Sequence, residues 1–446
     1  MTALSRRSLL AALSGAAGSA LLTAAPPAAA GTTTGTVLAA LTRAARPLRS
    51  TEPYGDLGDL RPLGAAIGEV PVVALGEAAH GAHELCALKH RVFRYLVLEK
   101  GFTTFALETS WTSGLRLNDY VRHGIGDPRA VMAEEFGGGA LPWGVHEYLE
   151  LIEWMRAHNL RRPEAPVEFM GNDIAHPYVP EALFRDVLDH ALRHHPALHA
   201  ELTGLYRELR AHSTTAEFGA LPQTERRRLA EQARRARRLL AGPGGSGRSA
   251  HEWAVQQARV IAQTATLLAF DLGDPRQVPE AMRYRDELMA FNTVWWYRRT
   301  GHRMLLSAHT GHTAYETYNP ESYPVVQGTY MRRSLGADYL SVGTTFGHGS
   351  ATTPRDEGGA WVVRRYPLPP AGGNEHTLNR VPYPVHFLDL RTVPSPAREW
   401  LRRARLTRDA DTPGSLHLPY ALARGHDLLI HLRTISPARP LPSVRS

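Results

Sequence analysis

Residues 72–91 read VVALGEAAHGAHELCALKHR, and they decide the fold because a buried strand passes directly into a helix there. The apolar runs at 71–77 and 102–108 have the length and composition of buried strands. The segment between them carries apolar residues at helical spacing, so the three pieces predict a βαβ unit. The same stretch crowds ionisable side chains behind the first strand, namely Glu77, His80, His83, Glu84, Lys89 and His90.

The rest of the chain continues the alternation of strands and helices. A helix at about 144–159 precedes a third strand at 167–173, and four later strands are expected at RMLLSAH, YLSVGTTF, VHFLDLR and LLIHLR. This order predicts an α/β fold with a mixed, mostly parallel central sheet flanked by helices. We expect an N-terminal α/β core at 31–180, a helical insertion at 181–300, and a C-terminal completion of the core, with a small α/β part, at 301–446.

The first 30 residues have the pattern of an export signal. Two arginines precede a short apolar run and then an Ala-x-Ala end, which resembles a twin-arginine signal. A retained membrane anchor fits less well, because serine and glycine interrupt the run. We therefore expect a secreted or extracytoplasmic protein with no stable membrane insertion once the signal is removed.

Composition excludes several classes of protein. The chain has 446 residues, of which 43% are hydrophobic and 21% charged, as in ordinary globular proteins. The net charge is +8, and the densest basic segment is a helical pattern that starts at Thr224 and contains no aromatic residue, so a solvated helix face is favoured over nucleic-acid binding. The single cysteine, Cys86, excludes an internal disulfide and is expected to be buried. We expect a monomer.

The common local signatures of hydrolases and nucleotide-binding proteins are missing. The sequence has no GxSxG, no HExxH and no glycine followed by lysine. Any site must therefore be assembled from segments that are distant in the sequence.

Polar side chains end four of the predicted strands. In open α/β sheets, ligands bind beyond the carboxyl ends of the strands, where such groups meet. There, a neutral imidazole can take a proton from water while a carboxylate fixes its tautomer. Taken singly, Glu77 or Glu108 could instead cap the helix that follows it. The residues concerned are Glu77, His80, Glu108, Asp173, His309 and His312.

These segments resemble the erythromycin esterase family. LGEAAHGAHELCALKH is similar to its first signature, and the similarity continues through GFTTFALE, WGVHEYLELIEWMRAHN, FMGNDI, RDELMAFNTVWW, SAHTGHTAY and LGADYLSVGTTF. The ordered series covers roughly residues 60–350. The resemblance implies a mixed α/β fold with a helical insertion, and hydrolysis of a macrolide lactone by activated water, as in antibiotic-resistance esterases.

The resemblance also implies roles for individual residues. His80 would be the general base, Glu77 and Glu108 would orient it or the water, and His309 would assist in the same pocket. Lys89 stands where the family has a basic residue important for activity. Three further residues are expected to contact the substrate: His312, Asp173 and Trp143. Thr310 departs from the asparagine that is usual in resistance esterases, which leaves the lactone or ester substrate open.

Two alternatives to ester hydrolysis stay open. The same histidines and glutamates could serve a natural-product tailoring enzyme that catalyses dehydration, cyclisation or acyl transfer. The chain could also be a metal or haem binding protein. We expect no cofactor, although three histidines and two glutamates could hold a divalent metal.

Overall fold

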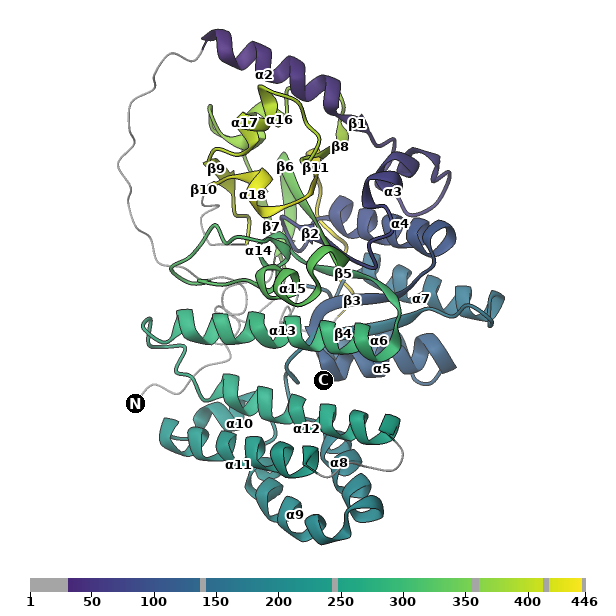
Figure 1. Ribbon diagram of the computed structural model, residues 1–446, viewed down its shortest axis with the longest axis vertical. Coiled ribbons are helices and arrows are strands. Elements are labelled where there is room, and N and C mark those ends of the chain that lie inside the picture. Colours follow the sequence, from purple (N-terminus) through teal and green to yellow (C-terminus); the bar gives the residue numbers. More distant parts are fainter. Residues whose placement is uncertain (1–30, 137–141, 243–247, 354–360, 412–416, 443–446) are drawn as a thin grey trace.

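The central sheet contains nine strands, as seen in the computed structural model, which describes residues 31–136, 142–242, 248–353, 361–411 and 417–442 (Figure 1). The predicted export signal at 1–30 lies outside the described residues. The strands follow the order β1 (Arg46–Pro47), β8 (Val385–Asp389), β11 (Leu428–Ile435), β6 (Tyr339–Thr353), β2 (Val72–Glu77), β5 (Arg303–His309), β3 (Phe102–Ser110) and β4 (Glu168–Asp173), with β7 (Val362–Tyr366) beside β6.

Most of the pairing is parallel. The six strands from β11 to β4 run parallel to one another, whereas β8 and β1 at one edge, and β7 beside β6, pair antiparallel. The mixed, mostly parallel sheet predicted from the sequence is therefore confirmed. A separate two-stranded sheet joins β9 (Arg405–Arg408) to β10 (His417–Tyr420).

Strand β2 is apolar up to Glu77 because both faces of the sheet are covered. Val73 and Leu75 point into one core, whereas Val72 and Ala74 point into another. The first core lies under α4 (His83–Lys100), α5 (Trp111–His123), α6 (Pro128–Phe136) and α7 (His146–Arg161). Helix α4 is the predicted link between β2 and β3, which completes the βαβ unit.

Helices make up the described part of residues 181–300. They are α8 (Glu181–His194), α9 (Pro196–Ala211), α10 (Thr215–Ala220), α11 (Gln223–Ala241), α12 (Arg248–Leu268) and α13 (Val278–Thr300). In Figure 1, α8 to α12 gather at the lower end, whereas α13 lies between them and the sheet. Helix α13 packs on β4 and on α15 (Gln327–Leu335), so it carries side chains to the sheet edge.

The arginine-rich segment is the solvated helix face that its pattern predicts. Within α11, Leu229, Ala233 and Leu240 are buried. Arginines on the other side pair with glutamates of the insertion, for example Arg228 with Glu225 and Glu208. Its charge is thus used for ion pairs along the surface.

A small α/β part covers the β8 edge of the sheet at the upper end of Figure 1. It combines the C-terminal helices with α2 (Gly31–Ala44) around one apolar cluster. None of the helices in the described ranges is both long and apolar enough to cross a membrane. The remaining helices are α3 (Arg61–Ile67), α14 (Thr310–Thr313), α16 (Asn374–Leu378), α17 (Ala397–Leu401) and α18 (Leu422–Gly425), with short 3-10 turns at Gly58–Leu60 and Gly336–Asp338.

Candidate active site

Neighbouring parallel strands bring the predicted polar residues to one edge of the sheet. Glu77 and His309 are register partners at the ends of β2 and β5. Strand β3 pairs with the other side of β5 and supplies Glu108. The close approach of the α14 turn explains the glycine before Glu77, because a Cβ on Gly76 would lie 2.5 Å from the Thr310 hydroxyl.

Glu77 links the strand end to His80. Its Oε1 lies 2.6 Å from Nδ1 of His80, while its Oε2 accepts from Nζ of Lys89 at 2.6 Å and from the Tyr148 hydroxyl at 3.2 Å. Glu77 is fully buried, and burial alone would raise its pKa, but Lys89 and His80 outweigh burial and lower that pKa. Glu77 is therefore an ionised carboxylate that fixes one face of the His80 ring.

Lys89 is held inside the protein. Its Nζ also donates to the Ser307 hydroxyl on β5 at 2.8 Å, and its side chain is 1% exposed. Because α4 begins at His83, His80 stands outside the helix, and Lys89 reaches the same carboxylate from the helix. Lys89 thus contacts Glu77 rather than the pocket.

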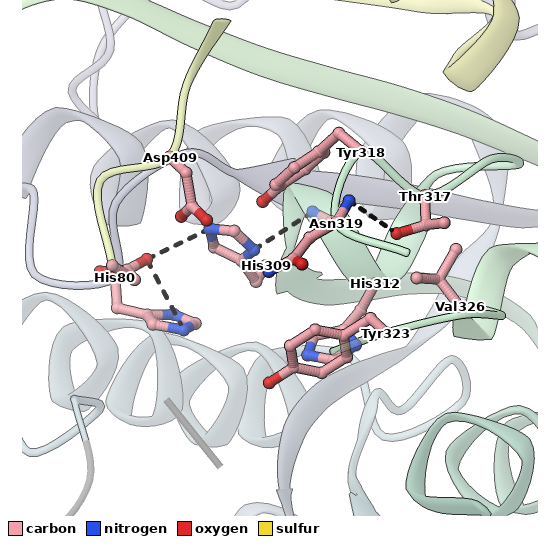
Figure 2. A pocket seen from close by; sticks show the side chains of 11 residues that line it. His80, His309, His312, Thr317, Tyr318, Asn319, Tyr323, Val326 and Asp409 are labelled. Atoms are coloured by element: carbon pink, nitrogen blue, oxygen red, sulfur yellow. Dashed lines mark hydrogen bonds and ion pairs between the residues drawn. The ribbon is translucent and has the colours of Figure 1, made fainter. Parts of the chain in front are cut away.

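Asp411 bridges the two histidines that face the pocket. Its Oδ2 lies 3.2 Å from Nε2 of His309 and 3.8 Å from Nε2 of His80 (Figure 2). Burial lowers the pKa of His80, but Asp411, Glu77 and Glu108 outweigh it and raise that pKa to about 9. The His80 imidazole is therefore positively charged at neutral pH in the resting protein.

His309 has a fixed tautomer. The backbone N–H of Gly311 donates to its Nδ1 at 3.2 Å, so Nδ1 is an acceptor and Nε2 carries the hydrogen that faces Asp411. The backbone N–H of His309 donates to Oε2 of Glu108 at 2.8 Å. His309 therefore presents its Nε2 edge to the Asp411 carboxylate at an ion-pair distance.

Arg285 on α13 holds a second buried layer of charges. Its guanidinium lies 3.0 Å from Oε1 of Glu108 and 2.6 Å from Oδ2 of Asp173. Burial raises the pKa of Glu108, but His312, Arg285 and His80 outweigh burial and hold that pKa well below its usual range. Burial outweighs Arg285 at Asp173 and raises the pKa of that carboxyl.

His312 extends this layer to the pocket wall. Its Nδ1 lies 2.7 Å from Oδ1 of Asp286, and its Nε2 lies 3.4 Å from Oε1 of Glu108. Burial lowers the pKa of His312, but Asp286 and Glu108 outweigh burial and raise that pKa. Both of its ring nitrogens are engaged with carboxylates.

Figure 2 shows the pocket beside His80 and His309, and Asp411 also lines it. His312, which we expected to contact the substrate, is part of its wall. The rest of the lining comes from α14, the loop after it and the residue that follows β9, with Gly311, Thr317, Tyr318, Asn319, Tyr323, Val326 and Asp409.

Two residues that were expected to contact the substrate do not line this pocket. The Trp143 side chain is 4% exposed and meets the His80 ring edge-on, with ring centroids 5.7 Å apart. Asp173 is held behind Glu108 by Arg285. Trp143 therefore contacts the pocket residue His80, and Asp173 is joined through Arg285 to Glu108.

The family profile matches most of the chain. The sequence profile of the erythromycin esterase family matches residues 97–435. The chain belongs to the erythromycin esterase family. The resemblance drawn from the strand-end motifs is thereby confirmed.

Individual relatives agree with this assignment. Erythromycin esterase type II of Escherichia coli is 33% identical over 129 residues, which is 29% of this chain and 29% of that protein. A protein from Bacillus cereus shares the fold with a TM-score of 0.81 at 25% identity, over 91% of this chain and 99% of its own. A succinoglycan biosynthesis protein gives 0.78 at 27% identity, over 92% and 100%.

A solved erythromycin esterase shares the fold at lower identity. A histidine-to-asparagine mutant of EreC in its open conformation has a TM-score of 0.69 and 15% identity, over 89% of this chain and 99% of its own. At this identity, the likeness concerns the fold. The α/β architecture of this chain is thus that of erythromycin esterase family structures.

Several charged residues of the site were not anticipated. Arg285 and Asp286 lie in the segment RDELMAFNTVWW, where two adjacent charges precede an apolar helix, and that pattern also fits an exposed helix start. Asp411 follows β9, and no motif marks it.

A metal would need several converging donor atoms. Within the described ranges, three such atoms lie within 4.8 Å of one another at one place only, a histidine cluster in the insertion.

His83 and His90 face a different hollow. Nδ1 of His83 lies 2.7 Å from Oε1 of Glu147, and its Nε2 lies 3.0 Å from Oε1 of Glu52. His90 is 1% exposed, and burial lowers its pKa to about 3. His83 and His90 line this hollow together with Tyr54, and His80 is not part of its lining.

Proposed function

We propose that this protein is a carboxylic ester hydrolase that opens a lactone or another ester with water activated by His80. The observation that carries this proposal is the buried Glu77 carboxylate, 2.6 Å from Nδ1 of His80. This contact keeps the hydrogen on Nδ1, which leaves Nε2 of the neutral ring free to accept a proton.

The reaction needs no covalent enzyme intermediate. Nε2 of neutral His80 takes a proton from water while the water oxygen adds to the ester carbonyl carbon. The carbonyl π electrons move to oxygen and give a tetrahedral oxyanion. Collapse of that species re-forms the carbonyl and breaks the bond to the alcohol oxygen, which takes the proton back from His80.

Two tyrosines are suited to stabilise the oxyanion. The phenols of Tyr318 and Tyr323 line the pocket, and burial raises the pKa of each above its usual value. Both groups therefore stay protonated and can donate hydrogen bonds to an oxygen that becomes negative.

The surrounding carboxylates give the reaction a characteristic pH dependence. His80 is the base only when neutral, and its pKa is raised to about 9. The active fraction therefore grows as pH rises towards 9. The same carboxylates stabilise the imidazolium that forms during the reaction, which favours proton transfer from water.

The substrate class is an uncharged lactone or ester. Asp409 and Asp411 line the pocket beside the histidines, so an anionic substrate would meet carboxylates there. Membership of the erythromycin esterase family supports a macrolide lactone as the first candidate. The neighbour named for succinoglycan biosynthesis is a reason to include esters carried on polysaccharides.

The experiment that tests this proposal is a substrate panel in water enriched in oxygen-18. Macrolides, simple lactones and saccharide esters are incubated with purified protein and with His80→Ala, and the products are weighed by mass spectrometry. Hydrolysis predicts one added water that carries the label, and its loss in His80→Ala. Products of unchanged mass, or products that have lost water, would instead support a tailoring reaction. Full activity after chelation is expected, because the proposal uses no cofactor.

We also propose that the first 30 residues direct export through the twin-arginine route. The paired Arg6 and Arg7 before the apolar run support this proposal. Replacing both by lysine should retain the protein in the cytoplasm, as measured by cell fractionation. Unchanged export of that variant would contradict the twin-arginine route.

A further inference from the structure

Three histidines meet in the helical insertion, whose helices α8 to α12 lie at the lower end of Figure 1. His190 lies on α8, His195 joins α8 to α9, and His251 lies in the first turn of α12. One ring nitrogen of each lies within 4.8 Å of the others. Helix α8, the α8–α9 junction and helix α12 therefore bring imidazole nitrogens to one place.

The distances are close to those of a metal site. Nε2 of His190 lies 3.1 Å from Nδ1 of His251. Tetrahedral zinc with bonds of about 2.0–2.1 Å places neighbouring ligand nitrogens roughly 3.4 Å apart. The His195 ring is farther out, with its centroid 5.9 Å from that of His190 and 5.3 Å from that of His251. The three nitrogens lie within 4.8 Å of one another, so zinc binding requires His195 to move toward the other two rings.

His195 provides a second, independent observation. Its Nε2 is buried and has no hydrogen-bond partner among the described residues. A buried polar atom without a partner carries a desolvation cost, and a bound cation would remove it. His190 is itself buried, so two of the three donors are already shielded from bulk water.

We propose that His190, His195 and His251 form a zinc site that clamps α8, α9 and α12 together. Three imidazole nitrogens suit Zn²⁺ better than Mg²⁺ or Ca²⁺, which prefer oxygen ligands. Water fills the fourth position, or the exposed ring of His194, whose centroid lies 4.7 Å from that of His190. The site is structural and independent of ester hydrolysis at His80.

The site predicts a specific effect on stability. The cluster ties the end of α8 to the start of α12, which are separated in sequence by two other long helices. Zinc that binds only the folded insertion raises the melting temperature in proportion to the logarithm of its free concentration. The effect should be carried by the insertion and leave the turnover of an ester substrate unchanged.

The test uses untagged protein, so that no polyhistidine tag contributes ligands. Zinc is added, excess metal is removed by gel filtration, and the bound metal is counted by mass spectrometry. The test variant is His195→Gln with His251→Gln. The matched control is His199→Gln, on α9 in the same insertion but outside the cluster, and His80→Ala separates this site from the pocket. Circular dichroism checks that each variant is folded.

The proposal expects one zinc per chain in the wild type, in His199→Gln and in His80→Ala. The double variant should lose at least about tenfold in zinc affinity and should show no zinc-dependent rise in melting temperature. Cobalt substituted for zinc should give the visible absorption of a four-coordinate site in the wild type but not in the double variant. Absence of stoichiometric zinc in the wild type, equal zinc in the folded double variant, or loss of zinc in His80→Ala would overturn it.

Discussion

Oε1 of Glu77 lies 2.6 Å from Nδ1 of His80, and Glu77 stands at the end of β2 beside the end of β5. This contact joins a charge fixed by the sheet to the ring that faces the pocket. Because Glu77 also binds Lys89, strand β2 and helix α4 together hold the carboxylate that orients His80.

Replacing the proposed base should abolish most of the activity. His80→Ala removes the proton acceptor, so kcat should fall about 10²–10⁴-fold, with little change in fold. His83→Gln is the matched control, because His83 stands three residues away but faces Glu147 and Glu52. Steady-state kinetics on an ester found in the panel makes the comparison. Equal losses in both variants would mean that His80 has no special role.

Asp411 should set the pH at which His80 becomes neutral. Its charge is the largest single effect that raises the pKa of His80, and Glu77 adds a hydrogen bond and its own charge. Asp411→Asn should therefore lower the midpoint of the kcat/KM pH profile by about 1 unit. Since the neutral ring is the active form, the variant should retain a larger share of its maximal rate at pH 7. An unchanged midpoint would show that Asp411 does not act on the titrating group.

Lys89 should stabilise the fold through Glu77. Lys89→Met leaves a buried carboxylate without its cation, which should cost about 3–5 kcal/mol in the free energy of unfolding. The double variant with Glu77→Gln should recover part of this loss, as measured by urea unfolding. Lys100→Met is the control, because Lys100 pairs with the exposed Glu69. This substitution should lower the free energy of unfolding by less than about 1 kcal/mol. Similar losses at the two lysines would contradict this account.

Arg285 should govern stability at acid pH. It helps to hold the pKa of Glu108 well below its usual range. A carboxyl with a lowered pKa contributes stability above its unfolded value of about 4.3, and this contribution is lost as pH falls below that value.

Arg285→Met should therefore lower the unfolding free energy at pH 7 by about 3–5 kcal/mol and weaken its dependence on acid pH. Arg283→Met is the control, because Arg283 is exposed on the same helix and pairs with Glu287. Urea unfolding at pH 7 and at pH 4 measures both effects. A pH dependence in Arg285→Met as steep as in the wild type would exclude Glu108 as its source.

The parts of the site that follow from local sequence were predictable. Apolar runs of strand length mark β2, β3, β4 and β5, and the carboxyl ends of parallel neighbours must meet at one edge. Glu77, Glu108 and His309 directly end such runs, so their convergence needs no knowledge of the long loops.

The missing parts depend on long-range packing. Asp411 reaches His80 and His309 only because the segment after β9 folds back over the sheet edge. The sequence pattern predicted that Trp143 and Asp173 contact the substrate. In the structure, Trp143 packs on the His80 ring, and Arg285 of α13 donates a hydrogen bond to Asp173. Local sequence indicates which side chains lie at strand ends, but the packing of distant helices decides whether those side chains face the pocket.

The most direct test of His80 as the base is the pH dependence of kcat/KM for an uncharged ester in the wild-type protein. With the pKa of His80 near 9, kcat/KM should rise by about tenfold per pH unit from pH 6 and level off above pH 9. A rate that is flat over this range, or that falls as pH rises, would contradict water activation by His80.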